Sequence, residues 1–346
     1  MRDLQLRLGQ NLGDGLALFL FLIFWLTYNA LHPKGFSPDV LVQNANEAFV
    51  ISMVAMAQTV PVIMGGLDLS VGATMTLVNC LASVLLDGSP LEIVFGMVVC
   101  LLAGLAAGFV NGCVVVYGRI QPIIATLATG AIYIGLALFL RPTPGGDVNE
   151  DLAWAMSNDL RELCATFGLF EDGEAAWLKP FAWLPVPLVI AVLVVVLVWI
   201  PFRNSVTGRG VYAVGSAEGA AYKSGLRIER SKLAAFTLAG FFAGVGGLYL
   251  ALQTSSGNAD VPQAAAYTLN SIAAVVIGGT SLMGGSGGAI GSLIGALVIR
   301  AISFNFRIFD VAPLLQPLIE GLVLLAAVSL GAGRTFRVKN RLELLG

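Results

Sequence analysis

The sequence predicts an all-α polytopic membrane protein with about ten transmembrane helices and both termini in the cytoplasm. Its composition is the first support. Hydrophobic residues occupy 57% of the 346 positions and charged residues only 12%, whereas a soluble globular chain carries about 25% charged residues. The mean hydropathy is +0.85, and long apolar runs recur along the chain. These properties exclude an ordinary soluble domain, a disordered chain and a nucleic-acid-binding protein.

The apolar runs divide the chain into candidate spans, and we interpret residues 1–346 as a single transmembrane domain. The runs lie at about 15–31, 44–64, 70–87, 91–117, 121–140, 182–201, 232–253, 268–283, 287–308 and 313–330. A span needs about 20 residues, so run 268–283 is the weakest candidate. The first run is too long for a cleaved signal sequence, so we expect a retained helix there.

The placement of Lys and Arg predicts the orientation, because cytoplasmic loops are enriched in both. With the amino terminus in the cytoplasm, thirteen of the 19 basic residues lie in cytoplasmic segments and five in external ones. The acidic loop 141–180 then lies outside, and the basic loop 202–231 lies in the cytoplasm. An amphipathic helical pattern runs from Asp151 to Phe170 in the outer loop. This loop is either a solvated cap or a docking surface for an extracytoplasmic partner.

Glycine spacing predicts close helix packing. Glycines recur four residues apart at 104–112, 240–244 and 287–295, and small residues at this spacing let transmembrane helices approach closely. Such motifs indicate a compact helix bundle and say nothing about a substrate.

Two similar Gly-Gly breaks interrupt apolar runs, at VIMGGLDLSVG (62–72) and VVIGGTSLMGG (275–285). They resemble a weak internal repeat of the kind found in transporters. Both lie at the cytoplasmic ends of their helices in the predicted topology. Asp68 and Ser70 either cap the helix that begins at about residue 71 or take part in the pathway or its gating. The candidates for pathway or gating roles are Gly65, Gly66, Asp68, Ser70, Gly278 and Gly279.

The cytoplasmic segment 203–232 is the longest predicted inner loop and contains six basic residues against two acidic ones. We expect Ser216 to cap a short helix that stops near Gly225. A helix this short needs support from another surface. A basic loop also suits anionic lipid, but this one lacks bulky apolar anchors, which favours a protein socket.

Four segments together resemble the membrane permeases of bacterial ABC importers for ribose, xylose, arabinose and galactose. They are GGLDLSVG (65–72), AAGFVNG with QPIIATLATGAIYIGLAL (106–138), GRGVYAVGSAEGAAYKSGL (208–226) and NSIAAVVIGGTSLMGGSGGAIGSLIGA (270–296). The resemblance runs from about residue 40 to 330, with the segments in the expected order.

The resemblance implies a permease subunit in the bacterial inner membrane that transports a monosaccharide or related polyol. It implies three protein partners: a cytoplasmic ABC ATPase, a periplasmic sugar-binding protein and a second permease copy or paralogue; we also expect contact with membrane lipid. It implies no cofactor on this chain, because ATP and magnesium would bind the ATPase. The family's coupling region, a cytoplasmic helix that contacts the ATPase, matches the segment Glu218, Gly219, Ala220, Ala221 and Gly225.

Other transport functions remain open on the sequence alone. A permease of the same superfamily could carry nucleosides, autoinducer-like sugars or branched-chain amino acids. An ion-coupled secondary transporter needs interior acids or histidines, for which Asp68 and Glu320 are the candidates. The chain contains no G-x4-G-K-[ST] phosphate loop, and no catalytic or metal-ligand constellation, so we do not expect an enzyme.

Two charges stand out deep within predicted spans, Arg300 in run 287–308 and Glu320 in run 313–330. The short connection between their helices makes the helices antiparallel neighbours, with the two charges at similar depth. Because an isolated charge in the bilayer is costly, we predict an Arg300–Glu320 ion pair. This pair either holds two helices together or lines the pathway and contacts sugar hydroxyls.

Overall fold

The computed structural model describes the chain at residues 2–168 and 176–312, together with Leu315, Gln316, Leu318, Ile319, Gly321, Leu322 and Leu325. Throughout these ranges every regular element is a helix, and β-type pairing is confined to two isolated bridges. The helices of the first half are α1 (Arg2–Leu31), α2 (Pro38–Ile63), α3 (Val71–Leu85), α4 (Pro90–Val116), α5 (Pro122–Leu140), α6 (Glu150–Ser157) and α7 (Leu160–Thr166). Those of the second half are η1 (Ala176–Phe181), α8 (Val186–Val194), η2 (Val195–Trp199), α9 (Ile200–Asn204), α10 (Val206–Lys223), α11 (Ile228–Thr254), α12 (Val261–Ile277) and α13 (Ala289–Ile308).

Among the described residues, six helices are long and apolar enough to cross a membrane. Three shorter apolar helices are α3, α12 and the Gly15–Leu31 part of α1. Together they correspond to nine of the ten predicted runs. The tenth run, 313–330, lies mostly outside the described residues. The run predicted at 268–283 is instead α12, which begins earlier, at Val261, and ends at Ile277. Asp260 starts this helix by accepting a hydrogen bond from the amide of Gln263, so polar residues that the hydropathy pattern left out belong to the helix.

Proline and a polar cap define where several spans begin. Ser37 precedes Pro38 at the start of α2, and Ser89 precedes Pro90 at the start of α4. Proline suits the first helical turn because its missing N–H would be unpaired there in any case. In α4 the Glu92 carboxylate accepts a hydrogen bond from the amide of Ser89 (2.7 Å), which completes a capping box.

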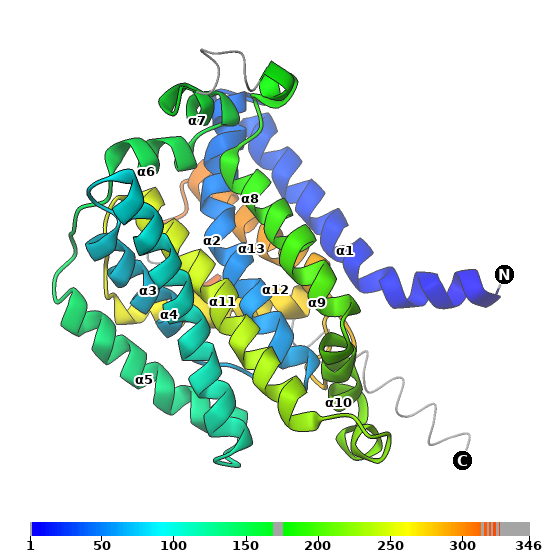
Figure 1. The fold of residues 1–346 in the computed structure, drawn as a ribbon. Helices are drawn as coiled ribbons and strands as arrows, with labels where there is room; N and C mark the ends of the chain where they lie inside the picture. The colour runs from blue at the N-terminus through cyan, green and yellow to red at the C-terminus, as the bar shows by residue number, and fades with distance from the viewer. Residues whose placement is uncertain are drawn as a thin grey trace.

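Helix α2 lies at the centre of the bundle (Figure 1). In its most apolar window 94% of the residues are buried, compared with 33% in α4 and in α5. Helix α11 packs against α2, α3 and α4, while α13 packs against α1, α2 and α12. The described helices thus form a central α2–α11 pair, with α4, α5 and α8 turning apolar faces outward.

Glycine contacts join α4 to α11, so the close packing that the glycine spacing predicts is confirmed at these two motifs. A methyl group at Gly104 would lie 2.6 Å from the carbonyl oxygen of Gly240. A methyl group at Gly108 would lie 2.9 Å from the Cα atom of Gly240. Larger residues would force these helices apart. At the other predicted motif, Gly291 and Gly295 pack against α12, whereas Gly287 lies in the loop before α13 and has a φ of +116°.

The polar segments divide between the two ends of the bundle (Figure 1). Helices α6 and α7 lie at one end, with the beginning of α2, and α10 lies at the other, with the end of α2. The described parts of loop 141–180 and loop 202–231 therefore lie at opposite ends of the bundle, as the predicted orientation requires. The segment after α5 contains two short helices, α6 and α7, rather than one continuous helix from Asp151, and the predicted end at Phe170 lies outside the described residues. Asp159 breaks the helix because its side chain caps α7, accepting from the amide of Glu162 (3.0 Å).

Candidate functional site

The first element of the candidate site is α10, whose end the sequence predicts but whose beginning it does not. The helix starts at Val206, because Ser205 accepts a hydrogen bond from the Gly208 amide (3.0 Å). Extended backbone at Ala217 separates it into two helical pieces. Ser216 was expected to cap the second piece, but its hydroxyl donates to the carbonyl oxygen of Tyr212 (2.9 Å). The predicted stop is confirmed, since α10 ends at Lys223 and Gly225 has a φ of +77°.

The second piece of α10 presents a small exposed surface. Glu218, Gly219, Ala220 and Gly225 are exposed, whereas Ala221 is only 5% exposed and belongs to the hydrophobic core. Ala221 was expected to contact a partner protein directly, and its burial makes it an anchor for the segment instead. Tyr222, which is 72% exposed, supplies apolar area beside it.

An ion pair holds this exposed piece to the first turns of α11. The Lys232 ammonium lies 2.6 Å from the Glu218 carboxylate, and 25% of the Lys232 side chain and 54% of the Glu218 side chain are exposed. The short helical piece therefore has the external support that its length requires. A force applied at Glu218 would reach α11 through this contact.

The first piece of α10 packs onto both Gly-Gly breaks. The amide of Gly285 donates to the carbonyl oxygen of Ile63, the last residue of α2 (2.7 Å), and Gly215 of α10 lies against both groups. The Tyr212 hydroxyl donates to the carbonyl oxygen of Gly287 (2.9 Å). Burial raises the pKa of Tyr212 above its ordinary value, with an opposing effect from Arg203, so it remains a neutral donor at neutral pH.

The four glycines of the breaks have two different functions. Gly65 and Gly279 have φ values of +86° and +79°, a left-handed conformation that strains other residues. Gly278 packs against the backbone of Gly291 in α13, and Gly66 packs against the side chain of Pro122. The structure thus brings the two breaks together with α10, a relationship that their separation in sequence does not reveal.

A buried polar network connects the first break to α4 and α5. The Asp68 carboxylate accepts hydrogen bonds from the amide (2.8 Å) and the hydroxyl (2.6 Å) of Ser70. The Asn111 amide donates to the Ser70 hydroxyl (2.7 Å), and the Tyr133 hydroxyl lies 3.1 Å from the Asn111 side-chain oxygen. Ser70 occupies the position before α3, yet its side chain makes no capping bond to that helix. The network therefore does not serve as a side-chain cap of α3 but joins the start of α3 to α4 and α5.

Sequence reasoning missed Asn111 and Tyr133. Both lie in apolar spans, where a polar side chain signals a buried partner. Asn111 belongs to the AAGFVNG segment, so its position in an otherwise apolar run was the available signal.

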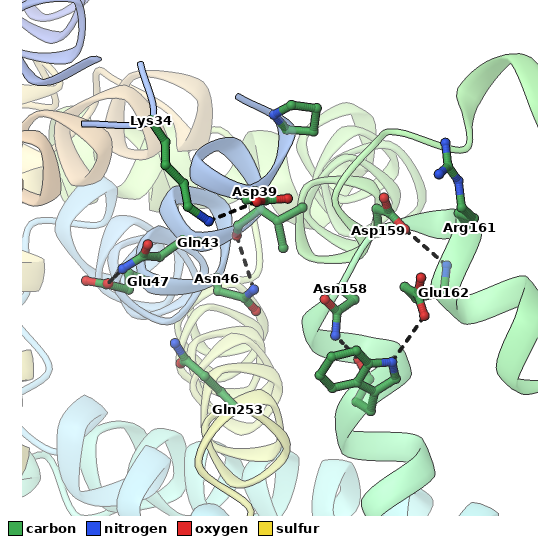
Figure 2. Close-up of a pocket in the computed structure, with 13 residues that line it drawn as sticks. Lys34, Asp39, Gln43, Asn46, Glu47, Asn158, Asp159, Arg161, Glu162 and Gln253 are labelled. Atoms are coloured by element: carbon green, nitrogen blue, oxygen red, sulfur yellow. Dashed lines mark hydrogen bonds and ion pairs between the residues drawn. The ribbon is translucent and has the colours of Figure 1, made fainter. Parts of the chain in front are cut away.

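The opposite end of the bundle contains a polar cavity of about 640 Å³ (Figure 2). It lies between the start of α2 and the α6–α7 segment, and Figure 2 shows amide and carboxylate groups around it. Its lining includes Lys34, Asp39, Gln43, Asn46, Glu47, Trp154, Asn158, Asp159, Arg161, Glu162 and Gln253. Mixed amides, carboxylates and an indole ring are suited to hydrogen bonding and stacking with a neutral polyhydroxylated molecule.

The intramembrane cation Arg300 contacts α2. Its Nε donates to the carbonyl oxygen of Glu47 (2.9 Å), and the Glu47 carboxylate pairs with Arg307. The predicted partner of Arg300, Glu320, lies outside the described residues. Sequence reasoning overlooked Glu47, which lies in the first turn of a predicted span close to Asn44 and Asn46.

Comparison with known proteins agrees with these features. The family model described as "Branched-chain amino acid transport system / permease component" matches residues 40–328. The ribose import permease of Bacillus subtilis is 32% identical, with 93% of this chain and 92% of the relative covered. The D-allose transport system permease of Escherichia coli K12 is 27% identical, covering 90% of this chain and 89% of that protein. No solved structure matches the chain at a significant level.

The family match covers most of the chain, and the described helices include enough apolar spans for a multi-pass membrane protein. The chain therefore belongs to the permease-component family of transport systems, and it is a transport subunit rather than an enzyme.

Proposed function

We propose that this chain is the transmembrane permease subunit of an ATP-binding cassette importer in the bacterial inner membrane, and that it transports a monosaccharide or related polyol. One observation carries the proposal: α10 packs directly on both Gly-Gly breaks and presents an exposed, ion-paired surface at the same end. The names of the relatives support the substrate class, since they import ribose, D-allose and autoinducer 2.

The proposed mechanism uses α10 as the coupling element. A cytoplasmic ATPase would contact the surface of Glu218, Gly219, Ala220 and Gly225, and closure of its nucleotide-binding domains would push α10. Because Gly215 lies against Ile63 and Gly285, this displacement would reach α2 and the loop before α13 together. The ATPase can switch the bundle between its outward-open and inward-open states only if its contacts with the bundle differ between those two states.

The pathway would run from the polar cavity at the α6–α7 end towards the Gly-Gly breaks. A periplasmic binding protein would deliver the sugar at this outer end, and a second permease copy or paralogue would complete the transporter. Gly65, Gly66, Asp68, Ser70, Gly278 and Gly279 then act in gating, through the backbone conformation of the breaks and the network around Asp68. ATP and magnesium would be held by the ATPase.

A co-purification experiment tests the coupling surface. The chain is purified in detergent together with a candidate ABC ATPase subunit, and wild type is compared with Glu218→Arg. The control is Glu150→Arg, which reverses an exposed charge at the opposite end. We expect the ATPase to be lost only from Glu218→Arg. The Lys232→Gln variant removes the ion pair with Glu218 but leaves the exposed residues of α10 unchanged. It therefore shows whether Glu218→Arg acts by removing a contact with the ATPase or by freeing α10 from α11.

Uptake measurements test the class of transporter. Sugar uptake in cells that depends on the ATPase and resists a proton uncoupler supports the importer. Uptake that collapses with the uncoupler, together with no ATPase in any purified sample, would instead favour an ion-coupled secondary transporter that uses the buried Asp68. Competition by ribose and allose, compared with nucleosides and branched-chain amino acids, tests the substrate class.

A further inference from the structure

A second cavity, of about 540 Å³, lies where α4 ends and α11 begins. Its lining consists of Val116, Tyr117, Arg119, Arg227, Glu229 and Arg230. Helices α4 and α11 reach the end of the bundle that carries α10, but this cavity shares no residue with the α10 site (Figure 1). The proposed transport function assigns it no role.

The cavity is strongly positive. Three arginine side chains border it against one carboxylate, that of Glu229. Among the residues that the structure describes, none of the three arginines forms an ion pair. Helix α11 begins here without a side-chain cap, so the positive end of its dipole and its first amides add to the same field. These features together favour a phosphate group over a neutral ligand.

The cavity lies at the depth of lipid headgroups. Helices α4 and α11 each have 27 residues, about 40 Å at 1.5 Å per residue, so both extend beyond a hydrocarbon core of about 30 Å. Tyr117, 70% exposed, directly follows α4, in the position that tyrosines favour at the membrane interface.

An exposed apolar track leads from the cavity along α4. Residues seven apart lie on one helix face, and Phe109, Leu102 and Phe95 continue the line of Val116 with exposed fractions of 48%, 56% and 65%. A free phosphate would leave this track unused, whereas the acyl chains of a phospholipid would cover it.

We propose that the cavity between α4 and α11 binds the headgroup phosphate of an anionic phospholipid, with Arg119 and Arg230 as its main cationic contacts. The bound lipid would bridge the connection after α4 to the first turn of α11. The bound lipid would stabilise the contact between α4 and α11. Lys232, which forms the ion pair with Glu218, lies two residues after Arg230 and so next to this site.

Thermal unfolding of the purified full chain in detergent tests this proposal. The probes are phosphatidylglycerol, phosphatidylcholine with the same acyl chains, and inorganic phosphate. The test variant carries Arg119→Gln and Arg230→Gln and leaves Arg227 at the start of α11 intact. The control variant carries Arg203→Gln and Arg209→Gln, which remove the same charge elsewhere on this end of the chain.

We expect phosphatidylglycerol to raise the unfolding temperature of wild type and control, and phosphatidylcholine to have little effect. The test variant should need about 25-fold more phosphatidylglycerol for half the effect, because each basic residue near an anionic surface contributes a factor of about five. An equal response in test and control variants would overturn the proposal. Stabilisation by inorganic phosphate to the same extent would overturn the lipid as the source of the phosphate.

A second variant keeps the proposal testable if the arginine substitutions prevent folding. Glu229→Gln removes the carboxylate from the cavity, so it should lower the phosphatidylglycerol concentration needed for half stabilisation. Native mass spectrometry should also detect more retained phosphatidylglycerol per chain in this variant. No change in either measurement would contradict a phosphate site at this position.

Discussion

Gly215 of α10 lies directly against the carbonyl oxygen of Ile63, the last residue of α2, so that a methyl group in its place would overlap that oxygen. The same methyl group would lie 2.7 Å from the amide of Gly285, which donates to the Ile63 oxygen. A helix on the surface of the bundle thus contacts the ends of two breaks that are more than 200 residues apart.

Gly215→Ala should therefore destabilise the junction by about 1–3 kcal/mol, because the added methyl overpacks rigid backbone. The matched control is Gly219→Ala in the same helix, where a methyl group would meet nothing within 4 Å. Alanine favours the helix there, so its unfolding temperature should stay equal or rise. Thermal unfolding of both purified variants measures the difference, and equal unfolding temperatures would contradict the close contact.

Gly108→Ala should weaken the crossing of α4 and α11 by a similar amount, since the new methyl would overlap the Phe236 carbonyl oxygen. Gly135→Ala in α5 is the control, because the space beside Gly135 is open. Size-exclusion chromatography after a graded heat step reports the fraction that stays folded. A heat-stable Gly108→Ala variant would mean that the glycines do not set the distance between these helices.

The network around Asp68 predicts a specific rescue. Asp68→Asn turns an amide donor towards the Asn111 amide, and Asn111→Asp brings a second carboxylate close to Asp68. Each change should cost about 1–3 kcal/mol, the penalty for an unsatisfied buried group. The double variant restores one acceptor facing one donor, so it should recover part of the unfolding temperature. If the double variant loses as much stability as the two single variants together, Asp68 and Asn111 are not directly coupled.

Two ion pairs near the α6–α7 end of the bundle should differ in strength. The Arg307–Glu47 pair has a Glu47 side chain that is only 20% exposed, whereas both side chains of the Lys34–Asp39 pair are more than half exposed. Arg307→Gln should cost about 1.5 kcal/mol or more, since the Glu47 carboxylate loses a charged donor. Lys34→Gln should cost less than about 1 kcal/mol. Equal losses in thermal unfolding would contradict this ranking.

The proposed orientation predicts which side a reagent reaches. Ser216 and Arg161 are exposed at opposite ends of the bundle. A membrane-impermeant maleimide should label Arg161→Cys in intact spheroplasts, and should label Ser216→Cys only after permeabilisation. The unsubstituted chain, with its four native cysteines, gives the background. The reverse pattern would invert the topology, and equal labelling would contradict the separation of the two ends.

Much of the fold was predictable, because the main signals are local. Apolar run length and glycine spacing depend on a single helix at a time, so the spans and the close packing at the glycine motifs agree with expectation, whereas the pairing of α4 with α11 was not predicted. Boundaries were less accurate where a polar cap lies outside the apolar run, as at Asp260 before α12. In α10, the interpretation of Ser216 as a cap was wrong because Ser216 ends the first helical piece, where its hydroxyl donates to Tyr212, and extended Ala217 separates it from the second piece.

The sequence by itself determined the membrane class, the approximate spans, the stop at Gly225 and the family, since composition, periodicity and motif order require no knowledge of distant contacts. Only the tertiary structure decided that Asn111 and Tyr133 join Asp68, that Arg300 contacts Glu47, and that Ala221 is buried. The physical reason is that these relationships depend on the rotation and crossing of helices far apart in sequence. Hydropathy predicts that a helix is buried, but packing selects the neighbour that each of its side chains meets.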